Sequence, residues 1–131
     1  MTAPRPGPDA SSTLADRRAR QSRGRWSEMK AAGVLRLKGY RILERRWRSS
    51  AGEVDIVALR GKRLAFVEVK HRASTSDDEA HGAVGGRQIG HLYAAADQWL
   101  QRNKAHRDYD VGFDLVIVAP GQWPRHIPNA L

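Results

Sequence analysis

The chain has 131 residues, the usual size of one domain, and it contains no cysteine. Disulfide bonds and thiolate metal sites are therefore excluded, and no apolar run approaches the roughly 20 residues that span a bilayer. The formal net charge is +9, divided into +11 over residues 1–73 and −2 over residues 74–131. This asymmetry favours a polyanionic partner, with nucleic acid before an anionic membrane surface. The alternative is a generic basic surface in an arginine-rich proteome.

The N-terminal segment, residues 1–23, is rich in proline, small polar residues and arginine, and it lacks the apolar core of a secretory signal. We expect a disordered basic tail here, followed by one folded domain over residues 24–131. A cytoplasmic location is expected, because the chain has neither cysteine nor a secretory signal.

The first elements of the domain are predicted from apolar spacing. Apolar residues recur at helical spacing over residues 25–38, and Gly39 follows where a C-terminal helix cap belongs. A strand is expected over residues 40–47, although its apolar and basic residues do not alternate cleanly. Two β-rich runs, residues 53–60 and 63–70, enclose Gly61-Lys62, which predicts a hairpin with a two-residue turn.

The rest of the chain supplies a loop, a helix and a strand. Residues 73–85 are small and polar and predict a mobile loop. A second helix is expected over residues 87–104 and a last strand over residues 111–120, where Pro120 ends it. The predicted order is α-β-β-β-α-β, which indicates an α/β fold with a mixed central sheet flanked by helices.

The predicted hairpin brings charged side chains together. If Arg60 pairs with Arg63 across the turn, Asp55 lies opposite Glu68. Directly opposed residues have Cβ atoms roughly 4.5–5.5 Å apart. Facing carboxylates repel each other unless one is protonated or a cation lies between them. Hard oxygen ligands of this kind suit Mg²⁺ or Mn²⁺, so the hairpin predicts a metal site.

The alternative is that these charges lie on the solvated outer face of an amphipathic hairpin. Both faces of the hairpin are apolar, however. Asp55 shares one face with Val57, while Val54 and Ile56 share the other. Strands with two apolar faces are typically buried on both sides. Burying charges there without a function would cost several kcal/mol, which favours a functional site.

Asp55 followed by Glu68-Val69-Lys70 resembles the PD-(D/E)XK nuclease motif in its strand-turn-strand setting. The strings GEVDIVAL and LAFVEVKHR are preceded by LRLKGYRILERRWR and followed by the terminal HIPNAL. Over residues 24–131 they are similar to the YraN family of uncharacterised endonuclease-like proteins. The resemblance implies a restriction-endonuclease-like fold close to that of archaeal Holliday junction resolvases.

The resemblance also assigns residues. It implies that Glu28 is the glutamate of the first helix, that Asp55 is the hairpin aspartate, and that Glu68 and Lys70 form the E-x-K motif. The bland alternative for Glu28 is a first-turn glutamate favoured by the helix dipole. A further family glutamate corresponds to Glu53, which could instead form a salt bridge with Lys70.

Phosphate contacts are expected on both sides of the hairpin. Where the family usually has a lysine on its second helix, this chain has Gln88 beside Arg87, and this departure leaves that contact open. Basic residues before the hairpin are also expected to bind phosphates, which would make affinity fall with salt; they are the tail arginines together with Arg36, Lys38, Arg45, Arg46 and Arg48.

Three other residues have two interpretations each, and a fourth has none. Trp47 and Trp123 could stack on bases, but tryptophan is more often a core residue. Asp114 could face the core, with capping or solvation as the favoured alternative. His126 has no zinc-ligand spacing and is given no role.

The hypothesis is that Asp55, Glu68 and the Val69 carbonyl bind Mg²⁺ or Mn²⁺, which polarises a phosphate oxygen and lowers the pKa of a bound water. Lys70 would orient that water and stabilise the developing charge. The expected function is metal-dependent phosphodiester hydrolysis by a structure-selective DNA endonuclease. The alternative is a catalytically inactive nucleic-acid-binding module that keeps the nuclease fold. DNA is favoured over RNA, no membrane partner is expected, and a homodimer follows if two strands are cut.

Overall fold

A computed structural model describes residues 13–80 and 82–131, so the part of the predicted tail over residues 1–12 lies outside the described residues. The elements follow in an α-β-β-β-α-β order, as expected, with short additions. They are α2 (Thr13–Leu37), β1 (Arg41–Arg48), β2 (Glu53–Arg60), β3 (Arg63–His71), α3 (Asp77–Ala80), α4 (Gly86–Arg102), the 3₁₀ helix η1 (Lys104–His106), β4 (Asp110–Val118) and β5 (Arg125–Ile127).

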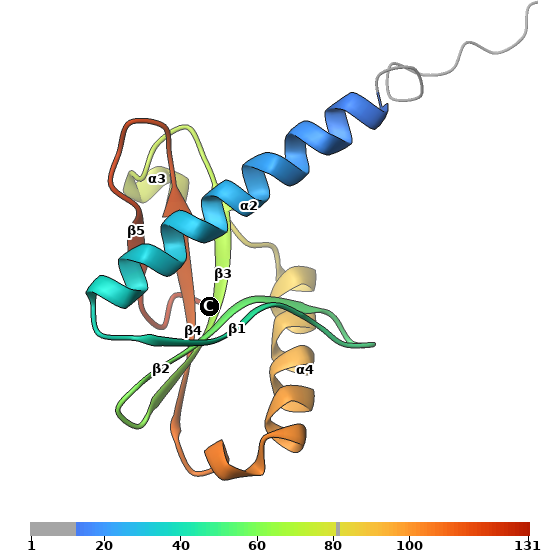
Figure 1. Cartoon of the computed structure of the whole chain (residues 1–131), viewed down its shortest axis with the longest axis vertical. Coiled ribbons are helices and arrows are strands. Elements are labelled where there is room, and N and C mark those ends of the chain that lie inside the picture. Colours follow the sequence, from blue (N-terminus) through green and yellow to red (C-terminus); the bar gives the residue numbers. More distant parts are fainter. Residues whose placement is uncertain (1–12, 81) are drawn as a thin grey trace, which may run out of the picture.

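The strands form one five-stranded mixed sheet in the order β1-β2-β3-β4-β5. Pairing is antiparallel from β1 to β3 and between β4 and β5, whereas β3 and β4 are parallel and α4 provides their crossover. Helices flank the sheet, with α2 crossing one face and α4 on the other side (Figure 1). The predicted mixed sheet with flanking helices is confirmed at this level.

Each helix buries a separate apolar cluster against its face of the sheet. The α2 side holds alanines and a leucine of that helix against Ile56, Val67 and Val116, among others. The α4 side holds Phe66 and Trp99, whose ring centroids are 5.7 Å apart. The central strands are therefore apolar on both faces because both faces are covered, as the hairpin pattern predicts.

Helix α2 is longer than the sequence analysis predicts. It begins at Thr13 rather than Arg25, so residues 13–23 continue the helix instead of belonging to a disordered tail. These residues follow the last tail proline, Pro8, and are rich in alanine, arginine, leucine and glutamine, which have high helix propensity. This part of α2 extends away from the sheet in Figure 1.

The C-terminus of α2 is capped as predicted. Gly39 has a positive φ of 94°, and the Tyr40 N–H donates to the Leu35 carbonyl while the Gly39 N–H donates to Arg36. These bonds form a Schellman motif, which turns the chain directly into β1.

Three short elements were not expected. The three-residue strand β5 pairs with β4, α3 lies within the predicted loop over residues 73–85, and η1 begins where the helix predicted over residues 87–104 was expected to end. All three are too short to show a recognisable period in the sequence. None of the helices within residues 13–80 and 82–131 is long and apolar enough to cross a membrane.

Candidate active site

The β2–β3 hairpin has the predicted turn and register, but its ladder ends at the predicted site. Arg60 pairs with Arg63, and the pairs continue to Ile56 opposite Val67. Beyond them the Val69 N–H donates to the Asp55 carboxylate, with 2.8 Å between N and Oδ2. Since the same register would place Val69 opposite Val54, a side-chain oxygen has replaced a backbone partner where the strands separate.

Strand β2 also changes the direction of its side chains here. Val54 and Val57 both pack in the α4-side cluster, whereas Ile56 packs in the α2-side cluster. The prediction that Val54 shares a face with Ile56 is therefore wrong, because strict alternation fails around Asp55. On the neighbouring strand, Arg46 has a positive φ of 54° and is skipped between the pairs Arg45–Ile56 and Trp47–Val54. The Asp55 side chain thus lies in a local opening between irregular strands.

The acidic pair and the lysine are brought together and largely shielded. Lys70 Nζ lies 3.2 Å from Glu68 Oε1, and each of these side chains is 18% exposed. Burial, followed by the charge of Glu68, raises the pKa of Asp55 to about 8, although the Val69 N–H acts in the opposite direction. Burial also raises the pKa of Glu68 above its ordinary value, despite the opposing charge of Lys70. When both carboxylates are ionised, the site has more negative charge than one lysine compensates, and the raised pKa values reflect this.

A divalent cation would fit this excess charge. Two carboxylates and the Val69 carbonyl, which points to the same strand edge as the Val69 N–H, could supply oxygen ligands. Mg²⁺ commonly keeps several waters and needs only one or two carboxylates. Among the described residues, no three His, Asp or Glu side chains form a cluster that could hold a metal. A cation held by the two carboxylates would take its other ligands from water or substrate.

Glu28 reaches this region from α2 but has another partner. It is only 7% exposed, and its Oε2 accepts a hydrogen bond from Arg46 Nε. Its charge contributes to the raised pKa of Asp55, so the two carboxylates are close enough to interact. The structure places Glu28 in mid-helix, because α2 begins at Thr13. The first-turn interpretation of Glu28 is therefore wrong.

A cationic cleft of about 290 Å³ lies over Glu28. Three arginines line it together with Glu28 and Met29: Arg25, Arg45 and Arg46. Two of the three β1 arginines predicted to bind phosphate thus line the cleft that contains Glu28.

Arg48 lies elsewhere, at the exposed end of β1. It pairs with Glu53, with Nε 3.8 Å from Oε2. The two residues are also opposite each other in the β1–β2 register. Glu53 thus pairs with Arg48 and not with Lys70, which corrects one of the expectations for this glutamate.

The first turn of α4 contains Arg87 and Gln88, and both side chains are exposed. One turn later, the backbone of His91 approaches Gly52, which immediately precedes β2. Residues three apart lie on the same side of a helix, so Gln88 shares the side of His91 that faces the β1–β2 loop.

A second polar cluster, which was not expected from the sequence, surrounds Asp114, whose side chain is fully buried. Arg63 donates two hydrogen bonds of 2.8 Å to its carboxylate, His126 Nε2 lies 2.8 Å from Oδ2, and the Asn129 N–H donates to Oδ1. These partners hold the pKa of Asp114 well below its ordinary value, although burial opposes them. The prediction that Asp114 is solvated is therefore wrong. The terminal string HIPNAL was the one available signal, since it contains His126 and Asn129.

The two tryptophans with open interpretations differ in burial. Trp47 is partly buried and packs against the α4-side cluster, as a core residue does. Trp123 is 72% exposed in the loop between β4 and β5, so the core interpretation is wrong for it.

These features define a class: an α/β protein in which an antiparallel hairpin opens around two shielded carboxylates and a lysine. The chain belongs to the uncharacterised protein family UPF0102, the YraN family indicated by its motifs, and the family model matches residues 27–118. It is 44% identical over 110 residues to a UPF0102 protein of Maricaulis maris, covering 84% of this chain and 85% of the relative.

Two further relatives extend the comparison along the chain. A UPF0102 protein of Rhodopseudomonas palustris (strain HaA2) is 47% identical over 115 residues, or 88% of each chain. A UPF0102 protein of Methylorubrum populi is 44% identical over 126 residues, covering 96% of this chain and 97% of the relative. Family membership therefore applies to nearly the whole molecule.

Proposed function

We propose that this protein hydrolyses phosphodiester bonds of nucleic acid with the help of a divalent metal ion, and that its fold is restriction-endonuclease-like. The observation that carries the proposal is the shielded Asp55–Glu68 pair beside Lys70, where excess negative charge lies at the opening of a hairpin. Such an arrangement is costly for stability and has a direct use in binding a cation.

Each residue has a definite part in this proposal. Asp55, Glu68 and the Val69 carbonyl would hold Mg²⁺ or Mn²⁺, which supplies Lewis-acid polarisation of a phosphate and a water of lowered pKa. Lys70 keeps its ammonium group beside Glu68 and presents it to the pentavalent phosphorus as negative charge develops there. The Val69 N–H fixes the orientation of Asp55.

The arginine cleft is the natural place for the phosphates next to the bond that is cut. Arg25 and Arg45 line it beside the Glu28–Arg46 pair, and guanidinium groups bind phosphate oxygens in a bidentate way. We place a DNA backbone here, with Arg87 and Gln88 contacting it from α4.

Cleavage assays with linear, flapped and four-way DNA substrates in Mg²⁺ or Mn²⁺ test the proposal. Asp55→Asn and Lys70→Met should each reduce the cleavage rate by at least about 10²-fold, because each removes a group that acts on the transition state. DNA affinity measured in Ca²⁺ should change little. Lys62→Met, at the exposed hairpin turn, is the matched control and should cleave normally. Equal cleavage by wild type and both site variants would refute the proposal.

A nucleic-acid-binding module without catalysis is the second candidate. The observation that favours it is the Glu28–Arg46 pair, which engages a third carboxylate that a nuclease could use. Calorimetric titration with Mn²⁺ separates the two functions. A nuclease should bind the ion with an affinity that Asp55→Asn abolishes, whereas a binding module should show no uptake that depends on Asp55.

A further inference from the structure

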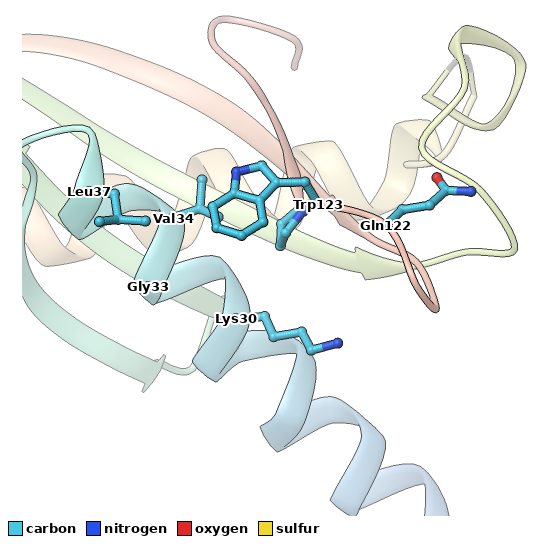
Figure 2. A pocket seen from close by; sticks show the side chains of 7 residues that line it. Lys30, Gly33, Val34, Leu37, Gln122 and Trp123 are labelled. Carbon is cyan, nitrogen blue, oxygen red and sulfur yellow. The ribbon is translucent and has the colours of Figure 1, made fainter.

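A second, apolar groove lies on the other side of α2 from the arginine cleft. It has a volume of about 510 Å³, within the range of about 300–1,000 Å³ typical of ligand sites. Lys30 lines this groove, whereas its neighbour Met29 lines the cleft that contains Glu28. Its walls are α2 and the β4–β5 loop (Figure 2), and its lining residues are Lys30, Gly33, Val34, Leu37, Gln122, Trp123 and Pro124.

The groove exposes a large aromatic surface. Trp123 is 72% exposed, and Leu37 across the groove is 75% exposed. Figure 2 shows the indole projecting from the β4–β5 loop toward α2 beside Val34. An exposed tryptophan in a hollow is unusual, because its large apolar surface favours burial. The indole face is thus available to a flat group.

Gly33 is a second, independent sign of an occupant. Glycine within a helix is destabilising by roughly 0.5–1 kcal/mol relative to alanine. A Cβ added at Gly33 would meet no atom within 4 Å, so packing in this molecule does not require the glycine. The space left by the missing side chain belongs to the groove, which suggests that a ligand uses it.

The charge around the groove indicates the chemistry of that ligand. Lys30 is the only charged residue in its lining, and Gln122 adds an amide with donors and acceptors. Lys30 Nζ also lies 5.1 Å from the ring centroid of Trp26, a further exposed tryptophan on α2. Aromatic surface interleaved with cations, on a chain of net charge +9, suits bases and their phosphates.

We propose that this groove binds an unpaired nucleobase, which stacks on Trp123 above Gly33 while Lys30 contacts the adjoining phosphate. The inference deepens the proposed function, on which it rests, because it specifies DNA with a single-stranded portion as the substrate class. Helix α2 separates the stacked base from the arginine cleft, so a strand reaching both sites must leave the duplex close to that cleft.

Fluorescence anisotropy with labelled oligothymidylate and with a duplex of equal length tests this proposal. Trp123→Ala should weaken single-strand binding about 5-fold to 150-fold, the loss that corresponds to one stacked base. Gly33→Leu fills the groove with a good helix former and should produce a similar loss without unfolding the protein. Duplex affinity should remain within about 2-fold for both variants.

Leu14→Ala is the matched control, because Leu14 is an exposed apolar residue on the same helix but does not line the groove. It should retain wild-type affinity for oligothymidylate. Unchanged single-strand affinity in both groove variants would overturn the proposal, and so would a loss of self-association in Trp123→Ala without any loss of oligonucleotide binding. Neither result would affect the proposed chemistry, whose test is Mg²⁺-dependent cleavage by the Asp55 and Lys70 variants.

Discussion

At the scale of single residues, the site is a conflict between stability and function. Asp55 is shielded from water, close to Glu68 and within the influence of Glu28, and it receives one compensating hydrogen bond from Val69. Lys70 partners Glu68, so the unfavourable interactions concentrate on Asp55. Groups with this combination of burial and like charge are typical of functional sites.

Asp55→Asn should therefore stabilise the protein in the absence of divalent ions. The amide oxygen can still accept the Val69 N–H, while the repulsion from Glu68 is removed. The free energy of unfolding should rise by about 1–2 kcal/mol, measured by urea denaturation in EDTA. Added Mg²⁺ should stabilise the wild type but not the variant. Asp78→Asn, at an exposed site on α3, is the control, and lower stability of Asp55→Asn would contradict this account.

At the scale of elements, the β1–β2 loop and α4 fix the position of β2. Gly52 ends the β1–β2 loop against α4, where an added Cβ would lie 2.9 Å from the His91 carbonyl oxygen. The contact is with backbone, so a side chain at residue 52 cannot be accommodated by a change of rotamer. Close approach here sets where β2 begins, and thereby where Asp55 lies.

Gly52→Ala should destabilise the protein by about 1–3 kcal/mol, because the loop must move away from α4. Thermal unfolding followed by circular dichroism measures the effect as a lower Tm. Gly90→Ala is the contrasting control: it lies within α4 and has no atom within 4 Å of an added Cβ, so it should raise the Tm. A Tm for Gly52→Ala equal to that of the wild type would show that the loop is not held by this contact.

At the scale of the whole molecule, the Asp114 cluster joins the C-terminal segment to the sheet. Arg63 from the start of β3, His126 from β5 and the backbone of Asn129 converge on this buried carboxylate. Tyr40, directly after the α2 cap, also accepts a hydrogen bond from Arg63 through its hydroxyl. One carboxylate thus connects segments that are far apart in the chain.

This cluster makes the stability of the protein depend on pH in the acidic range. Because its partners lower the pKa of Asp114, the stabilisation is present above the ordinary value of 3.8 and is lost as the pH falls below it. Asp114→Asn should cost about 3 kcal/mol near neutral pH, since Arg63 loses its buried partner. The difference in the free energy of unfolding between this variant and the wild type should become smaller between about pH 4 and pH 2, as measured by urea unfolding. A constant difference over this range would show that ionisation of Asp114 is not the source.

The sequence by itself determined the local features of this protein. The Gly61-Lys62 turn set the hairpin register, the Gly39 cap ended α2, and two apolar faces indicated strands covered on both sides. Each follows from residues close together in the chain, where turn geometry and side-chain period are sufficient.

Tertiary structure alone decided the rest. The opening at Asp55, the Glu28–Arg46 pair and the Asp114 cluster all join residues from different elements, so no local pattern encodes them. The exposure of Trp123 likewise depends on how the β4–β5 loop meets α2. The physical reason is that burial and pairing of a charged or aromatic side chain depend on its surroundings in space, which a sequence period does not specify.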